Sequence, residues 1–259
     1  MKSQQTSKPT RLRTAAQLLS RAAGTLLDWL YPRHCYACGA SLADESGHIL
    51  CEQCFGDLLR TRIEGPICVR CGLPLSADQD GLCGGCQSSE PHFDLARSVW
   101  PYARPAAEMI RSFKFDGDFF LGPMMVEGVL GMGWLPDIVR RADSVLPIPL
   151  HPRRRRERGY DQAHILARAL ARRIDRPLRS DILARHRYTE RQTRLTPRQR
   201  QKNVRGAFSV QDGADLDDGH LLLVDDVLTT GATAGECARK LKKAGAGQVT
   251  VFSLARTVT

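Results

Sequence analysis

Short apolar runs alternate with helical stripes of apolar residues over the C-terminal two thirds of the chain. A short β-branched or apolar run predicts a strand, and apolar residues three or four positions apart predict the buried face of a helix. The expected strands span residues 93–102, 144–149, 182–186, 220–224 and 248–254. The expected helices span residues 105–115, 121–135, 161–174 and 233–244. This alternation indicates an α/β domain in which helices cover a parallel sheet.

Three segments do not follow this pattern. Residues 188–205 are polar and rich in arginine, and we expect a long connection there. Residues 1–10 are polar and expected to be disordered. Residues 11–31 carry leucines at approximate helical spacing, which predicts a short amphipathic helix. Its arginine-rich composition also resembles a mitochondrial presequence, so the sequence leaves open whether this helix docks on the folded body or targets the protein.

The apolar runs are too short to cross a membrane. The longest, residues 221–224 and 249–254, have the length of strands, whereas a transmembrane helix needs about 20 apolar residues. No clean apolar core with a cleavage site is found near the N-terminus, as a secretory signal would require. We therefore expect no transmembrane segment and a reducing, cytoplasmic location.

Eight of the nine cysteines form four Cys-x-x-Cys pairs. The pairs are Cys35 and Cys38, Cys51 and Cys54, Cys68 and Cys71, and Cys83 and Cys86. The first two pairs are 12 residues apart and the last two are 11 apart. A two-residue gap lets both thiolates of a pair reach one ion, and a second pair completes a tetrahedron. The spacing predicts two structural Zn²⁺ ions in a double zinc ribbon.

The spacing leaves the pairing of the cysteines open, because the two sites could be sequential or cross-braced. Redox-active dithiols or disulfides are the weaker alternatives, since no secretory signal precedes the cysteines. A four-cysteine site has no open coordination position, so catalysis at the zinc is not expected. The ninth cysteine, Cys237, falls within an expected helix, where we expect it to be buried.

The formal charge of +10 is concentrated in one block. Between His151 and Arg205, 18 Lys and Arg stand against 5 Asp and Glu, a net of +13, whereas the rest of the chain has 20 basic and 23 acidic residues. Such a block favours a polyanionic partner such as pyrophosphate or single-stranded DNA. A solvated basic surface is the alternative. The block holds only two tyrosines, Tyr160 and Tyr188, so base stacking is expected to be modest.

The segment from Leu221 to Thr233 reads LLLVDDVLTTGAT. An apolar strand is expected to end in two carboxylates, followed by a loop of hydroxyl residues and glycine and then by a helix. Loop amides and a helix N-terminus attract an anion, and threonine hydroxyls can donate to it. The two acids suit the hydroxyls of a sugar or a Mg²⁺ ion. The alternative is that Asp225 faces solvent and Asp226 caps the loop.

The same segment resembles the phosphoribosyl pyrophosphate (PRPP) motif of type I phosphoribosyltransferases. The resemblance implies that the paired acids bind the ribose hydroxyls, that residues 229–233 bind the 5-phosphate, and that Mg²⁺ accompanies PRPP. Ribose 5-phosphate is the alternative ligand. The implied PRPP-binding residues are Asp225, Asp226, Val227, Leu228, Thr229, Thr230, Gly231, Ala232 and Thr233.

Further stretches narrow the resemblance to the ComF family, which is associated with competence for DNA uptake. They are the double zinc ribbon, Tyr102 with residues 112–118, residues 147–152 with residues 158–162, and Gln192 with Arg200, Asn203-Val204 and Ala207-Phe208. One departure is Asp161, where that family usually has Asn; it could weaken anion binding or cap the next helix. By position, the pyrophosphate loop would be Pro149, Leu150, His151 and Pro152, and the flexible loop would use Arg191, Arg194 and Arg198.

The resemblance implies a type I phosphoribosyltransferase fold, an α/β fold with a parallel sheet, behind a small double zinc ribbon. We expect a tail and helix in residues 1–31, the ribbon in residues 32–90 and the phosphoribosyltransferase-like domain in residues 91–259. Three functions are compatible with it: transfer of phosphoribosyl to a nitrogen acceptor, handling of single-stranded DNA, and PRPP sensing without turnover. The DNA-handling role with a PRPP site is favoured, with other competence proteins as further partners, whereas the sequence identifies no acceptor, catalytic residue or oligomeric state.

Overall fold

The computed structural model describes residues 34–42, 48–79, 81–189, 196–214, 216 and 218–258. The chain divides into two compact units, Met1–Phe55 and Gly56–Thr259, which we describe separately. The expected N-terminal tail and amphipathic helix lie outside the described residues. The domain boundaries expected from the sequence stay a prediction.

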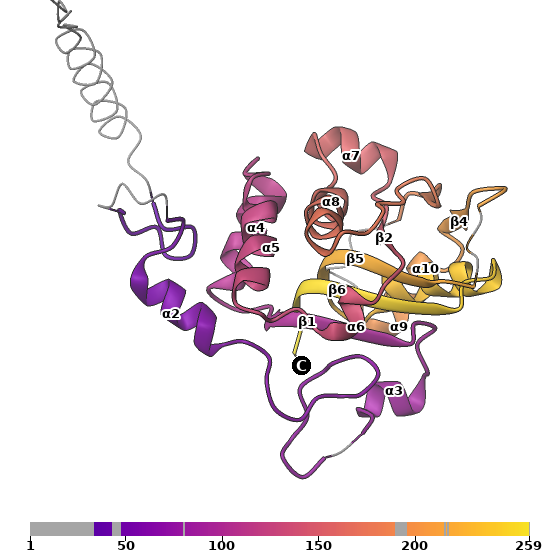
Figure 1. Ribbon diagram of the computed structural model, residues 1–259, viewed down its shortest axis with the longest axis horizontal. Coiled ribbons are helices and arrows are strands. Elements are labelled where there is room, and N and C mark those ends of the chain that lie inside the picture. The colour runs from indigo at the N-terminus through magenta and orange to yellow at the C-terminus, as the bar shows by residue number, and fades with distance from the viewer. Residues whose placement is uncertain are drawn as a thin grey trace, which may run out of the picture. The chain divides into compact units, whose positions relative to one another are not determined.

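Four parallel strands form the main sheet of the second unit (Figure 1). In spatial order they are β1 (Leu95–Pro101), β6 (Gln248–Arg256), β5 (His220–Leu228) and β2 (Ser144–Pro147). Nearly every residue of β6 and all four residues of β2 are buried. Burial on both faces is the reason that these strands are continuous apolar runs rather than alternating ones. The expected parallel sheet is confirmed.

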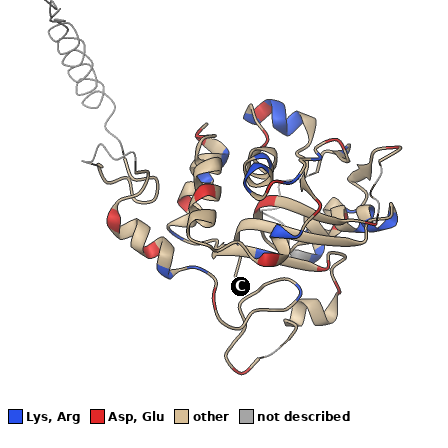
Figure 2. Ribbon diagram, in the orientation of Figure 1, with Lys and Arg blue, Asp and Glu red and all other residues tan. Residues whose placement is uncertain are grey.

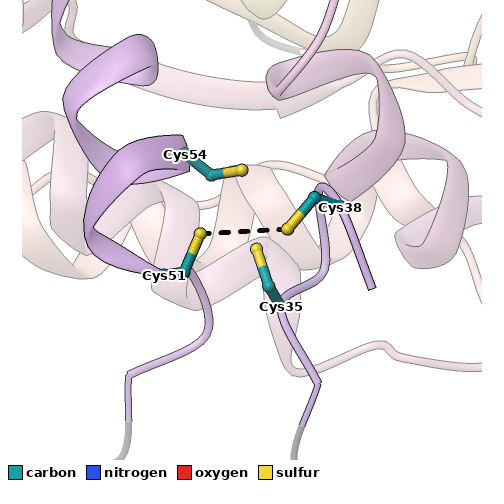
Figure 3. A group of neighbouring side chains, drawn as sticks. All are labelled: Cys35, Cys38, Cys51 and Cys54. Atoms are coloured by element: carbon teal, nitrogen blue, oxygen red, sulfur yellow. Dashed lines mark hydrogen bonds between the residues drawn. The ribbon is translucent and has the colours of Figure 1, made fainter. Parts of the chain in front are cut away.

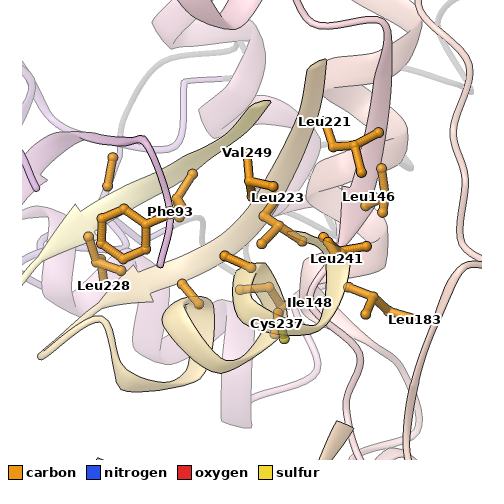
Figure 4. Close-up of a cluster of buried hydrophobic side chains, with 14 of the residues drawn as sticks. Phe93, Leu146, Ile148, Leu183, Leu221, Leu223, Leu228, Cys237, Leu241 and Val249 are labelled. Atoms are coloured by element: carbon orange, nitrogen blue, oxygen red, sulfur yellow. The ribbon is translucent and has the colours of Figure 1, made fainter. Parts of the chain in front are cut away.

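Helices pack on both faces of this sheet. The helices after β1 are α4 (Ala106–Phe115), α5 (Leu121–Gly131) and α6 (Asp137–Arg140), and those between β2 and β6 are α7 (Pro152–Arg158), α8 (Gln162–Ile174), α9 (Pro197–Val204) and α10 (Ala232–Lys243). Leu221 and Leu223 of β5 share a buried cluster with Cys237 and Leu241 of α10 (Figure 4). Side chains alternate along a strand, so Leu222 and the other intervening residues face the side on which α8 contacts β2 and β5. Cys237 is fully buried, as expected.

The structure corrects several expected elements. The strand expected at residues 182–186 is β3 (Leu183–Arg185), which pairs antiparallel with β4 (Phe208–Val210) outside the parallel sheet. The connection expected at residues 188–205 contains α9, which starts with a capping box of Thr196 and Gln199. The helix expected at residues 121–135 ends at Gly131.

Strand β5 is longer than expected. We expected it to end at Val224, before the two aspartates, but it continues through them to Leu228. The reason is its neighbour, because β6 runs to Arg256 and pairs Asp225 with Ser253 and Leu228 with Arg256. The ladder of backbone hydrogen bonds therefore carries both aspartates inside the strand.

The first Cys-x-x-Cys pair of each ribbon forms a knuckle, and the two knuckles have the same local geometry. The amide of Gly39 donates to the carbonyl of Cys35, and the amide of Gly72 donates to that of Cys68, both at 2.8 Å. A short antiparallel bridge encloses each of these knuckles, between His34 and Ser41 in the first unit and between Ile67 and Pro74 in the second. In each ribbon the second cysteine pair lies at the start of a short helix. Helix α2 (Glu52–Arg60) begins after Cys51 and contains Cys54, and α3 (Gly84–Ser88) begins after Cys83 and contains Cys86.

The second ribbon shares the core of the second unit. Its four cysteines belong to the same buried cluster as Phe93, Ala96 and the α10 face. Gly72 lies so close to this body that a Cβ would come within 2.6 Å of the Ala96 carbonyl oxygen, and its φ of +70° also favours glycine. The Arg256 guanidinium donates to the carbonyl of Cys71. The ribbon thus packs as part of the α/β body.

Candidate functional site

The first cysteine group lies in the first unit and brings Cys35, Cys38, Cys51 and Cys54 together (Figure 3). Their sulfur atoms all lie within 4.8 Å of one another, and those of Cys38 and Cys51 are 3.8 Å apart. A tetrahedral zinc site with Zn–S bonds of about 2.3 Å places its sulfurs about 3.8 Å apart. The geometry therefore fits a structural zinc with no open position.

The second group, Cys68, Cys71, Cys83 and Cys86, has the same form, and all four of its cysteines are buried. The Cys71 and Cys83 sulfurs are 3.6 Å apart. Burial raises the pKa of the Cys68 thiol, but the backbone amides of Cys71 and Cys83 donate to it and lower the pKa to about 6. At Cys68 this favours the thiolate, the form that binds zinc. The pairing is sequential in both groups, which settles the alternative left open by the spacing.

A cavity of about 330 Å³ opens at the carboxyl ends of β2 and β5. In an α/β sheet this is the edge where ligands bind. Most of the residues of the predicted PRPP motif line it, and so do Pro149 and Leu150 of the predicted pyrophosphate loop. The motif residues on its wall are Asp225, Asp226, Val227, Leu228, Thr229, Gly231, Ala232 and Thr233. Thr230 is exposed and is not among the lining residues.

The loop between β5 and α10 leaves a helix N-terminus open towards the cavity. Gly231 is the N-cap of α10, with φ of +75° and no side chain to cap the helix. A Cβ here would lie 3.3 Å from the Phe93 ring, so the loop passes too close to Phe93 for a larger residue without adjustment. The amides that begin α10 then face a site where the helix dipole favours an anion.

The two aspartates differ in their surroundings. Asp226 is buried and forms an ion pair with Lys114 of α4, with 2.7 Å between Nζ and Oδ1. Asp225 is half-buried and accepts a hydrogen bond from the Asp226 amide. Burial and the charge of Asp226 raise the pKa of the Asp225 carboxyl to about 7. Neither side chain therefore projects freely into solvent.

Five cationic side chains from four elements converge on the cavity, against three carboxylates. They are Lys114 of α4, Arg154 and Arg158 of α7, Arg185 of β3 and Arg200 of α9. Burial lowers the pKa of Arg158 and that of Arg185, although both remain cations at neutral pH. A half-buried cluster of like charges is costly unless an anion neutralises it. The wall is therefore suited to a ligand with several phosphates.

Arg185, which lines the cavity, has one buried donor without a partner among the described residues. Its Nη2 donates to the Thr189 hydroxyl at 2.5 Å, but its Nε is buried and has no hydrogen-bond partner within the part of the chain that the structure describes. Buried donors are rarely left unpaired, so this N–H is available to an acceptor.

The predicted pyrophosphate loop is only partly at the cavity. Pro149 and Leu150 line it, whereas His151 accepts a hydrogen bond from the Arg153 amide and Pro152 is the first residue of α7. Asp161 caps α8 by accepting from the His164 amide at 3.2 Å, and its other oxygen accepts from the Leu150 amide at 3.1 Å. Of the two interpretations of Asp161, capping is the one that the structure shows.

Of the predicted flexible-loop arginines, Arg191 and Arg194 lie outside the described residues. Arg198 is exposed on α9 and is not among the residues that line the cavity, whereas Arg200 is. Sequence reasoning did not assign Arg154, Arg185 or any of the other lining cations to the site. Three of them, Lys114, Arg158 and Arg200, stand in stretches that resemble the ComF family, and that resemblance was the signal available.

Comparisons with known proteins support both the zinc ribbon and the α/β domain. A family model of a double zinc ribbon domain matches residues 26–87, and a model of a phosphoribosyl transferase domain matches residues 161–257. The chain is 32% identical to competence protein F of Haemophilus influenzae over 74% of this chain and 85% of that protein. It is 31% identical to the DNA utilization protein YhgH of Escherichia coli K12, covering 88% of this chain and 98% of that protein. It is 29% identical to competence protein ComFC of Bacillus subtilis, covering 80% and 84%. Over the described residues, no helix is long and apolar enough to span a membrane.

Proposed function

The chain belongs to the family of competence protein F and the DNA utilization proteins, and from this we propose that it binds PRPP and handles single-stranded DNA in a competence-type role. The observation that carries the PRPP proposal is the convergence of the β5–α10 loop, two aspartates and five cations on one cavity. Each part of PRPP has a matching group there. The proposal concerns the binding of PRPP and does not require that the protein transfers its phosphoribosyl group.

The matching follows from charge and hydrogen-bonding capacity. The amides at the start of α10 and the hydroxyls of Thr229 and Thr233 would hold the 5-phosphate. Asp225 and Asp226 would accept hydrogen bonds from the ribose hydroxyls. The arginines of α7, with Arg185, would neutralise the pyrophosphate. The residues present also fit Mg²⁺, which takes carboxylate and phosphate oxygens; it would neutralise charge on the pyrophosphate when bound.

Calorimetric titration of the full chain with PRPP, with and without Mg²⁺, tests this proposal. We expect binding below millimolar concentration that Mg²⁺ strengthens, and weaker binding of ribose 5-phosphate, which lacks the pyrophosphate. No heat of binding at millimolar PRPP would remove the ligand assignment and leave only the fold.

The raised pKa of Asp225 implies that the stability of the unliganded protein depends on pH. A carboxyl whose pKa is raised from an unfolded value of about 3.9 favours folding below that value, and this contribution is lost as the pH rises towards 7. At pH 8 the unliganded Asp225→Asn variant should therefore melt at a higher temperature than the wild type. The difference should shrink towards pH 5. Thermal denaturation at both pH values measures it, with the exposed Asp212→Asn as a matched control. A variant that is less stable than the wild type at pH 8 would contradict the expected cost of ionising Asp225.

The DNA-handling part of the proposal is supported by the +13 block between His151 and Arg205 and by the two ribbons. Single-stranded DNA should bind with little preference for sequence, because charge rather than base contacts would dominate. The logarithm of the affinity should fall linearly with the logarithm of salt concentration, by about 0.7 for each phosphate contacted. Fluorescence anisotropy with a labelled oligothymidine over a salt series measures the slope. Binding that is absent at low salt, or that does not respond to salt, would refute it.

A further inference from the structure

Helix α7 is an arginine-rich helix in which no residue is buried. Its sequence from Pro152 to Arg158 is PRRRRER. Short helices usually form because one face packs on a core, and α7 has no such face. It is held at its ends instead, where His151 caps the first turn and the amide of Gly159 donates to the Arg155 carbonyl at 2.9 Å. Core packing therefore does not explain why these side chains are arginines.

The arginines of α7 point in two directions. Arg154 and Arg158, four residues apart and so on one face, line the cavity. Arg153, Arg155 and Arg156 are exposed, and Figure 2 shows the basic residues of α7. Arg153 pairs with Glu157 at 3.0 Å, whereas Arg155 and Arg156 have no ion-pair partner among the described residues. The cationic wall of the cavity thus continues onto an outward cationic face.

Tyr188 lies against this helix. Its ring is 4.8 Å from the Arg153 guanidinium and 5.4 Å from that of Arg154, and the His151 ring meets it edge-on at 5.2 Å. It is nevertheless 41% exposed. Tyr160, the other tyrosine of the basic block, is not similarly placed, because its hydroxyl donates to the Phe113 carbonyl and its ring packs on Phe113 and Phe119. Tyr188 is therefore an exposed aromatic ring that the cations beside it hold in place.

We propose that the outward face of α7 and Tyr188 form the surface that binds single-stranded DNA. Arg153, Arg155 and Arg156 contact phosphates, and a base stacks on the Tyr188 ring. Exposed aromatic rings among cations are the usual combination for single strands, because every base has a face that can stack. This assignment rests on the proposed DNA-handling function and adds the residues that perform it.

Salt dependence tests the arginines. Replacing Arg155 and Arg156 together with alanine should lower the salt slope of oligothymidine binding by about 1.4, the value for two lost phosphate contacts on a single strand. The matched control is the double change of Arg172 and Arg176, two exposed arginines near the end of α8, which removes the same charge elsewhere in the basic block. The control should keep the wild-type slope. Equal slopes in the two double variants would overturn the assignment.

Three single changes, at Tyr188 and Glu157, separate stacking from charge. Tyr188→Ala should weaken binding about fivefold or more at constant salt, with the slope unchanged, and Tyr188→Phe should bind like the wild type. Glu157→Gln removes a carboxylate from the face and frees Arg153, so it should tighten binding, a result that misfolding cannot produce. If the wild type binds DNA and neither Tyr188→Ala nor Glu157→Gln changes the affinity, the assignment of the binding surface to α7 and Tyr188 is wrong, whereas the proposed DNA handling stands. If the wild type does not bind, both fail, and PRPP titration of the same sample shows whether the cavity is intact.

Discussion

Replacing Asp225 and Asp226 together with asparagine should lower the affinity for PRPP by at least about tenfold. Each carboxylate is proposed to accept a charge-assisted hydrogen bond from a ribose hydroxyl, and one such bond contributes roughly 1.5–3 kcal/mol. Ribose 5-phosphate should lose affinity as well, because it has the same hydroxyls. Calorimetric titration of both ligands measures the effect.

Pyrophosphate is the matched ligand for this variant, because it has no ribose. Its binding should be kept or strengthened, since Lys114 loses its partner at 2.7 Å and becomes available to an anion. Retained pyrophosphate binding also shows that the variant is folded, which matters because breaking a buried ion pair is destabilising. A second variant, Thr233→Val, should weaken PRPP and ribose 5-phosphate alike through the phosphate. If the double asparagine variant binds PRPP as tightly as the wild type, the ribose assignment is wrong.

Removing one cysteine from each ribbon should have very different consequences. Cys38→Ser and Cys71→Ser should each reduce the zinc content from two ions per chain to about one, because three thiolates hold zinc less well than four. Only Cys71→Ser should strongly lower the melting temperature of the α/β body. Its site is part of the buried cluster that contains Phe93 and the inner face of α10, and structural zinc supplies much of the folding free energy of such modules. Elemental analysis and thermal denaturation of reduced protein measure both effects.

The same pair of variants should differ in ligand binding. Phe93 packs in the cluster with the second ribbon and lies against Gly231 of the β5–α10 loop. Loss of the second zinc should therefore weaken PRPP binding, whereas Cys38→Ser should leave it at the wild-type level. Equal losses of stability in the two variants, or a protein that contains no zinc, would contradict this account.

Local signals were sufficient for much of the fold. A Cys-x-x-Cys knuckle needs only four residues and a tight turn, so its pattern predicts a metal site wherever the rest of the chain lies. The β5–α10 segment is likewise a local unit of strand, loop and helix, and its placement beside the cavity agrees with the motif. Strands buried on both faces are visible as apolar runs. One local signal was overlooked: Thr196, Pro197 and Gln199 have the spacing of a capping box and mark the start of α9.

Other features depended on contacts between distant parts of the chain. The length of β5 was decided by its pairing with β6, because a strand continues as long as a neighbour supplies hydrogen bonds, even through two carboxylates. The ion pair of Asp226 exists because α4 brings Lys114 to the end of β5. The raised pKa of Asp225 comes from its burial in the folded chain and from the charge of Asp226.

The sequence by itself determined the chemistry that each segment offers: eight thiolates in two sets, two adjacent acids before a glycine loop, and a basic block. Only the tertiary structure decided which of these act together. It paired the ribbons sequentially, placed the second inside the core, and gathered cations from α4, α7, β3 and α9 around one cavity. Side chains that share a site through packing rather than through spacing leave no periodic pattern, and a single sequence does not show them.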